Sequence, residues 1–422
     1  MLQLSDIRNN TEELKKRLAK RSEDFADKLD SVIALDDARK EAQHRLNELQ
    51  SDMNSKSKSI GDLYKEGKTK EAESIKNETT KLKESIKEID SSLSKTEEEI
   101  RDLLVTIPNA PHESVPKGNT DQDNEIIKKS GEPREINNAV PHWDLADKYK
   151  LFDLDLGSKL TGAGFPVYLE KGAKLQRALI NWFLDSAIEA GYTEVIPPLL
   201  VNGETAFATG QLPDKEGQMY EMKEDPFYLI PTAEVPITNL YRDRILVEED
   251  FPVKMVGYTP CFRREAGSYG KDVRGLNRVH QFDKVEIVQI QHPDKSYATL
   301  DEMVSYVEGL VSKLGLTYRI ARLCSGDLGF TSALTYDMEV YSVAQEKWLE
   351  VSSISNFEAF QSNRLKLRYK NRDKKNILAH TLNGSAIALP RIVAALLENN
   401  QTDQGIIIPE VLQPYTGFKT IS

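Results

Sequence analysis

The first quarter of this chain repeats an apolar residue every seven positions and holds no proline, which restricts it to long helices. All 18 prolines of the 422-residue sequence lie at or after Pro108. Within residues 31–104 the repeat forms two seams, each apolar at eight of its ten positions. The seams are Val32, Leu35, Arg39, Ala42, Leu46, Leu49, Met53, Lys56, Ile60 and Leu63, then Ala72, Ile75, Thr79, Leu82, Ile86, Ile89, Leu93, Thr96, Ile100 and Leu103. Such narrow seams are typical of helices packed side by side.

The residues between the two seams predict a reversal of the chain. The run GDLYKEGK holds Gly61 and Gly67, and Tyr64 is the only Phe, Trp or Tyr between residues 31 and 104. Without large side chains this segment cannot form a globular core, so we expect an antiparallel hairpin. Two helices of about 32 residues would each reach about 50 Å at 1.5 Å per residue. The run Ile107-Pro-Asn-Ala-Pro ends the pattern, because proline removes a backbone donor and restricts the preceding residue.

The charge of the chain excludes a protein that coats nucleic acid by bulk attraction, since 56 Lys and Arg stand against 67 Asp and Glu. Residues 31–104 carry 14 basic and 17 acidic side chains, so the hairpin is not basic overall. Near the predicted turn the balance reverses, with Lys56, Lys58, Lys65, Lys68 and Lys70 against Asp62 and Glu66. These lysines are either a solvated tip or a patch that contacts phosphates, and the residues alone do not decide between the two.

Composition excludes several further classes of protein. The chain has no run of about 18 apolar residues, so we expect no transmembrane helix. Its start, MLQLSDIRNN, lacks the apolar core of a signal peptide. Cys261 and Cys324 are the only cysteines, too few for a disulfide framework or a cysteine-built zinc site. We therefore expect no zinc, no membrane and a location in the reducing cytoplasm.

After a polar linker at about 108–140, the sequence becomes that of a globular domain with mixed structure. The run GAKLQRALINWFLDSAIEAG (172–191) predicts an amphipathic helix, and YTEVIPPLLV after it predicts a strand interrupted by prolines. Strand pairs are expected at 253–266 with 276–291, and at 335–344 with 348–355. Antiparallel strands mixed with helices indicate an α+β fold.

The first of these strand pairs is unusually polar. The period of two in a strand places Arg263 and Glu265 on one face, and the same period groups Arg278, His280, Phe282, Lys284 and Glu286 on the partner strand. Guanidinium groups, an aromatic ring and carboxylates on one surface suit a nucleotide bound beside a small zwitterion. The alternative is an exposed sheet with cross-strand ion pairs.

FRREAG (262–267), followed by Arg278-x-x-x-Phe282-x-x-x-Glu286, resembles motif 2 of the class II aminoacyl-tRNA synthetases. The fuller string RGLNRVHQFDKVE is similar to that of seryl-tRNA synthetases. The other strings that resemble this family are PTAEVP (231–236), LEVSSISNFEAFQSNR (349–364) and LNGSAIALPR (382–391). The resemblance covers nearly the whole chain.

The resemblance implies an antiparallel-sheet catalytic domain with an N-terminal antiparallel coiled-coil arm. Residues 1–110 would form a tRNA-binding domain with the hairpin at 31–104, and residues 111–422 the catalytic domain. The three class motifs would lie near 185–200, near 260–286 and near 382–398. It further implies a homodimer formed through motif 1.

The family's serine site maps onto Thr232 and Glu234, with further contacts at Glu286, Asn383 and Ser385. A carboxylate can pair with the ammonium group of serine. A site that hydrogen-bonds the serine hydroxyl would reject alanine, because alanine would leave polar groups of the site unpaired. The ATP-binding residues implied by the resemblance are Arg263, Glu265, Phe282, Glu350, Val351, Ser352, Ser353 and Arg391. Of these, Arg263 and Arg391 are the implied catalytic residues, because guanidinium groups stabilise charge on the phosphates.

Mg²⁺ bound with ATP is the implied cofactor, held by Glu350 and Ser353. In motif 3, many family members have glycine where this chain has Ala386 and Pro390, and we expect Pro390 at the first position of a helix that presents Arg391. Cys261 is expected to be packed, and we assign no proton transfer to His280.

The implied activity is that of a serine–tRNA ligase. It forms seryl-adenylate from ATP and L-serine, then transfers serine to the terminal adenosine of tRNA(Ser) and, where one exists, of tRNA(Sec). Two other functions stay open: a related ligase that loads an amino acid onto a carrier protein, and a non-catalytic coiled-coil adaptor.

Overall fold

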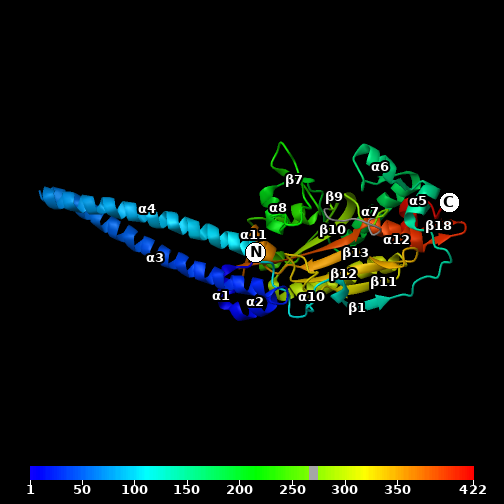
Figure 1. Cartoon of the computed structure of the whole chain (residues 1–422), viewed down its shortest axis with the longest axis horizontal. Coiled ribbons are helices and arrows are strands. Elements are labelled where there is room, and N and C mark those ends of the chain that lie inside the picture. Colours follow the sequence, from blue (N-terminus) through cyan, green and yellow to red (C-terminus); the bar gives the residue numbers. More distant parts are fainter. Residues whose placement is uncertain (266–273) are drawn as a thin grey trace. The chain divides into compact units, whose positions relative to one another are not determined.

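The computed structural model describes residues 1–265 and 274–422 (Figure 1). The last two residues of FRREAG therefore lie outside the described residues. The chain divides into two compact units, Met1–Pro108 and Asn109–Ser422. Among the helices within the described ranges, none is long and apolar enough to cross a membrane.

The N-terminal unit is entirely helical in the elements assigned to it. Its helices are α1 (Leu4–Asn9), α2 (Thr11–Leu18), α3 (Glu23–Lys65) and α4 (Thr69–Thr106). Helices α3 and α4 run side by side as the long hairpin of Figure 1. All twenty predicted seam positions are buried or partly buried, which confirms the coiled-coil arm.

The hairpin differs from the prediction at its ends. Helix α3 begins at Glu23 rather than near residue 31, where the Ser22 hydroxyl caps it by accepting from the Asp24 backbone N–H at 3.3 Å. Ala26 and Leu29 are buried and extend the seam by another turn. The helix also continues through Gly61, so the chain reverses only at residues 66–68.

A buried carboxylate joins α1 to α3. Asp36 accepts hydrogen bonds from Arg8 Nε at 2.5 Å, Arg39 Nη2 at 2.8 Å and Lys40 Nζ at 3.1 Å. Burial raises the pKa of Asp36, but these three cations outweigh burial and lower it to about 2. The carboxylate is therefore ionised at neutral pH and holds the first helix against the arm.

The second unit is built on an eight-stranded sheet, antiparallel except for the parallel pair at one edge. Its strands in spatial order are β1 (Glu125–Ser130), β11 (Tyr318–Arg322), β12 (Leu334–Ser342), β13 (Lys347–Asn356), β16 (His380–Ala388), β10 (Gln281–Gln291), β9 (Val253–Phe262) and β4 (Thr193–Glu194). This mixture confirms the predicted α+β class and the predicted antiparallel sheet.

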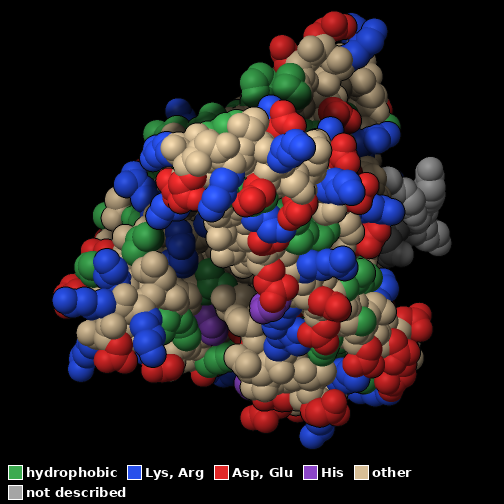
Figure 2. Space-filling view, turned by 90° about the vertical axis from the view of Figure 1, so that its left-hand side faces the viewer, with side chains coloured by type: hydrophobic (Ala, Val, Ile, Leu, Met, Phe, Trp, Pro, Cys, Tyr) green, Lys and Arg blue, Asp and Glu red, His purple; other side chains and the backbone are tan. Residues whose placement is uncertain are grey.

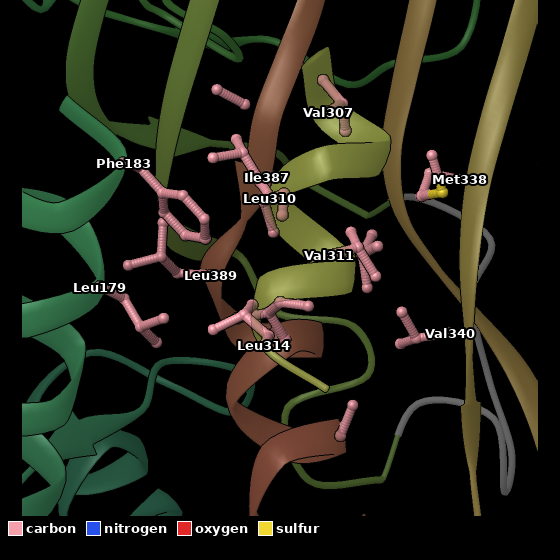
Figure 3. Close-up of a cluster of buried hydrophobic side chains, with 14 of the residues drawn as sticks. Leu179, Phe183, Val307, Leu310, Val311, Leu314, Met338, Val340, Ile387 and Leu389 are labelled. Carbon is pink, nitrogen blue, oxygen red and sulfur yellow. The ribbon is translucent and has the colours of Figure 1, made fainter. Parts of the chain in front are cut away.

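Three helices pack on this sheet: α7 (Glu170–Glu189), α10 (Ser296–Lys313) and α12 (Leu389–Asn399). The apolar residues of α7 recur at helical spacing, and Leu179 and Phe183 one turn apart are fully buried. Figure 3 shows these two side chains converging with Val307, Leu310, Val311 and Leu314 of α10, Met338 and Val340 of β12, Ile387 and Leu389. This core supports the strands that carry the candidate site.

The remaining elements are short. The small sheets contain β2 (Phe152–Asp153), β3 (Val167–Tyr168), β5 (Leu200–Asn202), β6 (Tyr220–Glu221), β7 (Phe227–Leu229), β8 (Ile245–Val247), β14 (Arg368–Lys370), β15 (Asn376–Leu378), β17 (Gln401–Thr402), β18 (Gly405–Ile407) and β19 (Thr420–Ile421). The other helices are α5 (His142–Tyr149), α6 (Leu154–Leu160), α8 (Gly203–Thr209), α9 (Glu234–Asn239), α11 (Phe360–Leu365) and α13 (Gln413–Thr416).

The motif 3 segment contains a bulge that the sequence did not predict. Glu286 pairs with Ser385 and Lys284 pairs with Ala388, so two residues, Ala386 and Ile387, stand opposite one. Ile387 has a φ of 109°, a backbone conformation that is rare for a β-branched residue. Because β16 runs into α12 at Leu389, Pro390 is the second helical residue rather than the first.

Candidate active site

One pocket of about 640 Å³ in the second unit is lined by residues from several of the quoted motifs. The predicted serine- and ATP-binding residues that line it are Thr232, Glu234, Arg263, Glu265, Phe282, Glu286, Glu350, Val351, Ser352, Ser353, Asn383, Ser385 and Arg391. Central strands β10, β13 and β16 supply most of them, so residues as far apart in sequence as Phe282 and Ser385 meet on neighbouring strands.

Paired residues on β10 and β16 form one wall of the pocket. Ser385 lies opposite Glu286 in the register, and its hydroxyl donates to Glu286 Oε2 at 3.2 Å. Lys284, two residues earlier on the same face, places Nζ 2.8 Å from the same oxygen. Both ionic side chains are buried, and a buried ion pair requires such close hydrogen bonding to offset its desolvation. The sequence placed Lys284 on this face but gave it no role.

Glu234 provides a second buried carboxylate at the start of α9. Its backbone N–H donates to Thr232 Oγ1 at 3.3 Å, and its Oε1 accepts from Gln361 Nε2 at 2.6 Å. Gln361 is oriented in turn by the hydroxyl of Thr381, 2.7 Å from Gln361 Oε1. Burial and the negative charge of Glu286 raise the pKa of Glu234 to about 7. A cation entering this pocket would be attracted by the ionised form of Glu234, and the nearby charge of Glu286 would add to that attraction.

Arg263 lies over an aromatic ring in another part of the same pocket. Its guanidinium carbon is 5.2 Å from the centre of the Phe282 ring, and its Nε donates to the carbonyl of Pro231 at 3.4 Å. Its backbone N–H donates to the carbonyl of His280 at 2.9 Å, which continues the pairing beyond the end of β9. Glu265 forms an ion pair with Arg278.

Arg391 is the third residue of α12 and reaches the pocket from the N-terminal end of that helix. Its Nη1 donates to the carbonyl of Glu350 at 2.8 Å and to Glu350 Oε2 at 3.2 Å. Its Nε donates to the carbonyl of Asn277 at 3.1 Å. A guanidinium at a helix N-terminus favours an anionic ligand, because the helix dipole adds to its charge.

The oxygen atoms near Glu350 suit a Mg²⁺ ion that arrives with a nucleotide. Glu350 and Ser353 line the pocket, and Asp337 lies opposite Ser353 across β12 and β13. Asp337 Oδ1 is buried, with no hydrogen-bond partner among the described residues. No cluster of three or more His, Cys, Asp and Glu side chains suited to a metal occurs in the described ranges. One or two carboxylates plus phosphate oxygens is the usual Mg²⁺ arrangement, so the donor set fits.

His280 does not share the pocket face, contrary to the strand periodicity. Strand β10 begins only at Gln281, so the alternation does not extend back to residue 280. The imidazole stacks on Phe165 with ring centres 5.3 Å apart, and its Nδ1 lies 2.9 Å from the Tyr220 hydroxyl. Cys261 is fully buried in β9, and burial raises the pKa of its thiol. Neither His280 nor Cys261 is among the described residues that line the pocket.

The predicted tRNA-contacting lysines belong to the hairpin of the N-terminal unit. Three of them have acidic partners: Lys56 with Glu78 at 2.7 Å, Lys65 with Asp62 at 3.5 Å and Lys68 with Glu66 at 2.9 Å. Lys58 and Lys70 are exposed. Figure 2 likewise shows basic and acidic side chains interspersed on the face it presents. Any phosphate contact here is therefore local.

Comparison with known proteins first identifies the class of protein to which the second unit is similar. Residues 218–400 match the family described as the tRNA synthetase class II core domain (G, H, P, S and T). A prolyl-tRNA synthetase structure from Giardia lamblia shares the fold, with a TM-score of 0.56, 16% identity and coverage of 64% of this chain and 54% of that one. The sheet that carries the pocket therefore has the fold of the class II aminoacyl-tRNA synthetases.

The arm and the full-length relatives narrow this class to one family. Residues 1–111 match the seryl-tRNA synthetase N-terminal domain. The chain is 51% identical to the serine–tRNA ligase of Salinibacter ruber, over 100% of this chain and 99% of that protein. The seryl-tRNA synthetase of Pyrococcus horikoshii, solved in complex with ATP, has a TM-score of 0.94 and 33% identity, covering 100% of this chain and 99% of that one. The chain belongs to the seryl-tRNA synthetase family.

Proposed function

We propose that this chain is a serine–tRNA ligase that activates L-serine with ATP and transfers it to tRNA(Ser), and to tRNA(Sec) where that tRNA is present. The observation that carries the proposal is the pocket, in which two buried carboxylates and two arginines meet on a class II sheet. Full-length relatives named serine–tRNA ligase support the choice of amino acid.

Serine binds at the end of the pocket that holds the buried acids. Glu234 and Glu286 attract its ammonium group, and Thr232, Asn383 and Ser385 supply hydrogen bonds to its polar groups. Gln361 holds Glu234 in place from outside the pocket lining. A site of this polarity discriminates against alanine, which would leave buried polar groups without partners.

ATP binds at the end that holds the arginines. Phe282 stacks on the adenine ring, Glu265 together with the Val351–Ser352 backbone completes the nucleotide site, and Arg263 and Arg391 hold the phosphates. A serine carboxylate oxygen attacks the α-phosphorus, and the bond to the leaving pyrophosphate breaks. Arg263 stabilises the charge that develops on the α-phosphate, so positioning and charge suffice without a protein base. Glu350 and Ser353 would hold the Mg²⁺ that accompanies ATP, and the ion would neutralise charge on the phosphates.

The second step transfers serine to the terminal adenosine hydroxyl of tRNA. The α3–α4 arm contacts the tRNA by its shape and backbone, with Lys56, Lys58, Lys65, Lys68 and Lys70 nearest the tip. Two chains pair through the motif 1 region, where Ile188 and Ile196 are 46% and 88% exposed. We place the homodimer in the reducing cytoplasm, because its two cysteines are both free. We propose no membrane attachment, in keeping with the lack of a membrane-spanning helix among the described residues.

The test of this function is pyrophosphate exchange with each amino acid, followed by charging of total tRNA. We expect exchange with serine, and charging of tRNA(Ser). Preferential exchange with threonine or glycine would refute the substrate assignment. Serine exchange without tRNA charging would favour a carrier-protein ligase, and no exchange at all would favour the adaptor.

The raised pKa of Glu234 predicts how serine recognition depends on pH. Below its pKa of about 7 the free enzyme carries a neutral Glu234, which attracts an ammonium group weakly. We therefore expect kcat/KM for serine to rise as pH increases through about 7 and then to level off, because kcat/KM reports groups of the free enzyme. Glu234→Gln should lower kcat/KM about 10- to 100-fold and flatten this profile. An unchanged profile in the variant would assign the titration to another group.

A further inference from the structure

A network of buried polar side chains lies behind the pocket and has no part in the function proposed above. At its centre is His142, the first residue of α5, which is fully buried together with Glu398 of α12 and Ser342 of β12. Glu398 Oε1 lies 2.6 Å from His142 Nδ1 and accepts the His142 backbone N–H at 3.0 Å. The other oxygen of Glu398 accepts from the Ser342 hydroxyl. The carboxylate is thereby satisfied without solvent.

The second ring nitrogen of His142 determines its protonation state. The backbone N–H of Leu276 donates to His142 Nε2 at 2.9 Å. A backbone amide can only donate, so Nε2 must be the unprotonated acceptor and Nδ1 must carry the hydrogen that Glu398 accepts. His142 is thus a neutral imidazole that joins α12 on one side to the motif 2 segment on the other.

The residue after Leu276, Asn277, contacts Arg391 of the pocket. The carbonyl of Asn277 accepts from Arg391 Nε at 3.1 Å, and the Asn277 amide donates to Gln345 Oε1 at 2.8 Å. Gln345 Nε2 donates to Glu398 Oε1 at 2.9 Å, which closes the network. Arg391 and Glu398 are both on α12, two turns apart. The position of Leu276 therefore determines where the carbonyl that orients Arg391 lies.

The residue before Leu276 shows that the backbone approaches the imidazole closely. Gly275 has a φ of 68°, and a Cβ atom at this position would lie 2.2 Å from His142 Nε2 and 2.9 Å from Trp143 Cε3. Both the left-handed conformation and the short approach require glycine. Because residue 275 is glycine, the backbone can approach the His142 ring closely enough for Nε2 to accept the Leu276 N–H.

We propose that His142 is a positioning residue for ATP, acting through Leu276 and Asn277 on the orientation of Arg391. It does not line the pocket and touches no reacting atom. The inference rests on the proposed assignment of Arg391 to the nucleotide. It predicts a defect in the use of ATP that is separate from the use of serine.

Two substitutions separate the contact of the imidazole with Glu398 from its contact with the Leu276 N–H. In His142→Asn the amide nitrogen can replace Nδ1 and still bind Glu398, but no acceptor reaches Leu276. In His142→Gln the amide oxygen can lie near the former Nε2 and accept the Leu276 N–H. We expect the Asn variant to raise the KM for ATP in pyrophosphate exchange about tenfold, or 1.4 kcal/mol, with the KM for serine unchanged. The Gln variant should recover most of the ATP affinity.

His292→Asn is the matched control for loss of a hydrogen-bonded histidine. His292 follows the other end of β10, and its Nε2 lies 2.8 Å from the Tyr369 hydroxyl. This control should lower the melting temperature without changing the KM for ATP. Gly275→Ala retains the imidazole of residue 142 but adds a methyl group that would lie 2.2 Å from Nε2, so the ring and the Leu276 N–H must move apart. It should reproduce the ATP defect, and it serves as the test if the Asn variant folds poorly.

Three outcomes would overturn the inference: a wild-type KM for ATP in His142→Asn, equal ATP defects in the Asn and Gln variants, or an equal rise in the KM for serine. The proposed function fails separately, if the wild-type protein exchanges with another amino acid instead. In that case the ATP comparison is made with that amino acid and still decides the role of His142.

Discussion

Replacing Arg263 with Ala should lower the rate of serine-dependent pyrophosphate exchange by about 10²- to 10³-fold, the usual effect of removing one group that stabilises transition-state charge. The guanidinium lies over Phe282 and lines the pocket, where the α-phosphate is proposed to bind. Arg263→Lys should recover only part of the rate, since an ammonium group lacks the planar fork that binds two phosphate oxygens.

The neighbouring arginine is the matched control. Arg264 is exposed, and it is absent from the pocket lining formed by the described residues. Arg264→Ala removes the same charge one residue away and should leave exchange within about twofold of wild type, as expected for a surface substitution. Melting temperatures should be similar for both variants. If the two variants lose activity equally, net charge rather than the pocket geometry is responsible, and the assignment of Arg263 is wrong.

The sequence predicted well those features that depend on a local periodic pattern of apolar residues. The hairpin follows from a seven-residue repeat, and the repeat identifies the buried face without knowledge of any distant contact. The ends of α3 were less predictable. Ala26 and Leu29 extend the buried seam of α3 toward its N-terminus. The Ser22 cap and the acidic first turn mark the true start of the helix at Glu23, which lies before the first residue of the predicted seam.

The site shows where such reasoning stops. Phe282, Lys284 and Glu286 alternate as a strand should, but His280 does not, because its backbone N–H pairs with Gly164 and its ring with Phe165. The bulge at Ile387 depends on how β16 pairs with β10, which no local pattern records.

His142 was missed for a similar reason. It follows a polar linker, and its partner Glu398 lies 256 residues away. A lone histidine beside a linker gives no signal in the sequence. The Gly275-Leu276-Asn277 run in the quoted motif was the available clue, since a required glycine indicates a close neighbour.

The hairpin can be shortened without disturbing its packing, which gives the sharpest test of its role. The helices are related about residue 67, as the Lys56–Glu78 ion pair shows, because both residues lie eleven positions from it. Removing residues 42–62 and 72–92 deletes three heptads from each helix, keeps the turn, and leaves the Asp36 cluster intact. Leu63 then takes the place of Ala42 and Leu93 that of Ala72. The arm becomes about 30 Å shorter.

This shortened variant should exchange pyrophosphate with serine at nearly the wild-type rate, while charging of tRNA(Ser) falls at least 100-fold. The pocket lies wholly within residues 210–391, so its residues are untouched. The arm loses Lys56, Lys58 and about 30 Å of reach, so the lysines kept at its tip no longer extend to the tRNA surface they are proposed to contact. The matched control is Lys58→Ala with Lys70→Ala in the full-length arm, which keeps the reach but removes two exposed charges. It should weaken charging moderately and reduce the salt dependence of tRNA binding, because fewer phosphate contacts release fewer counterions when the tRNA binds. Equal loss of exchange and charging in the shortened variant would show that the arm supports the catalytic unit itself, and unchanged charging would show that the tRNA does not need the arm.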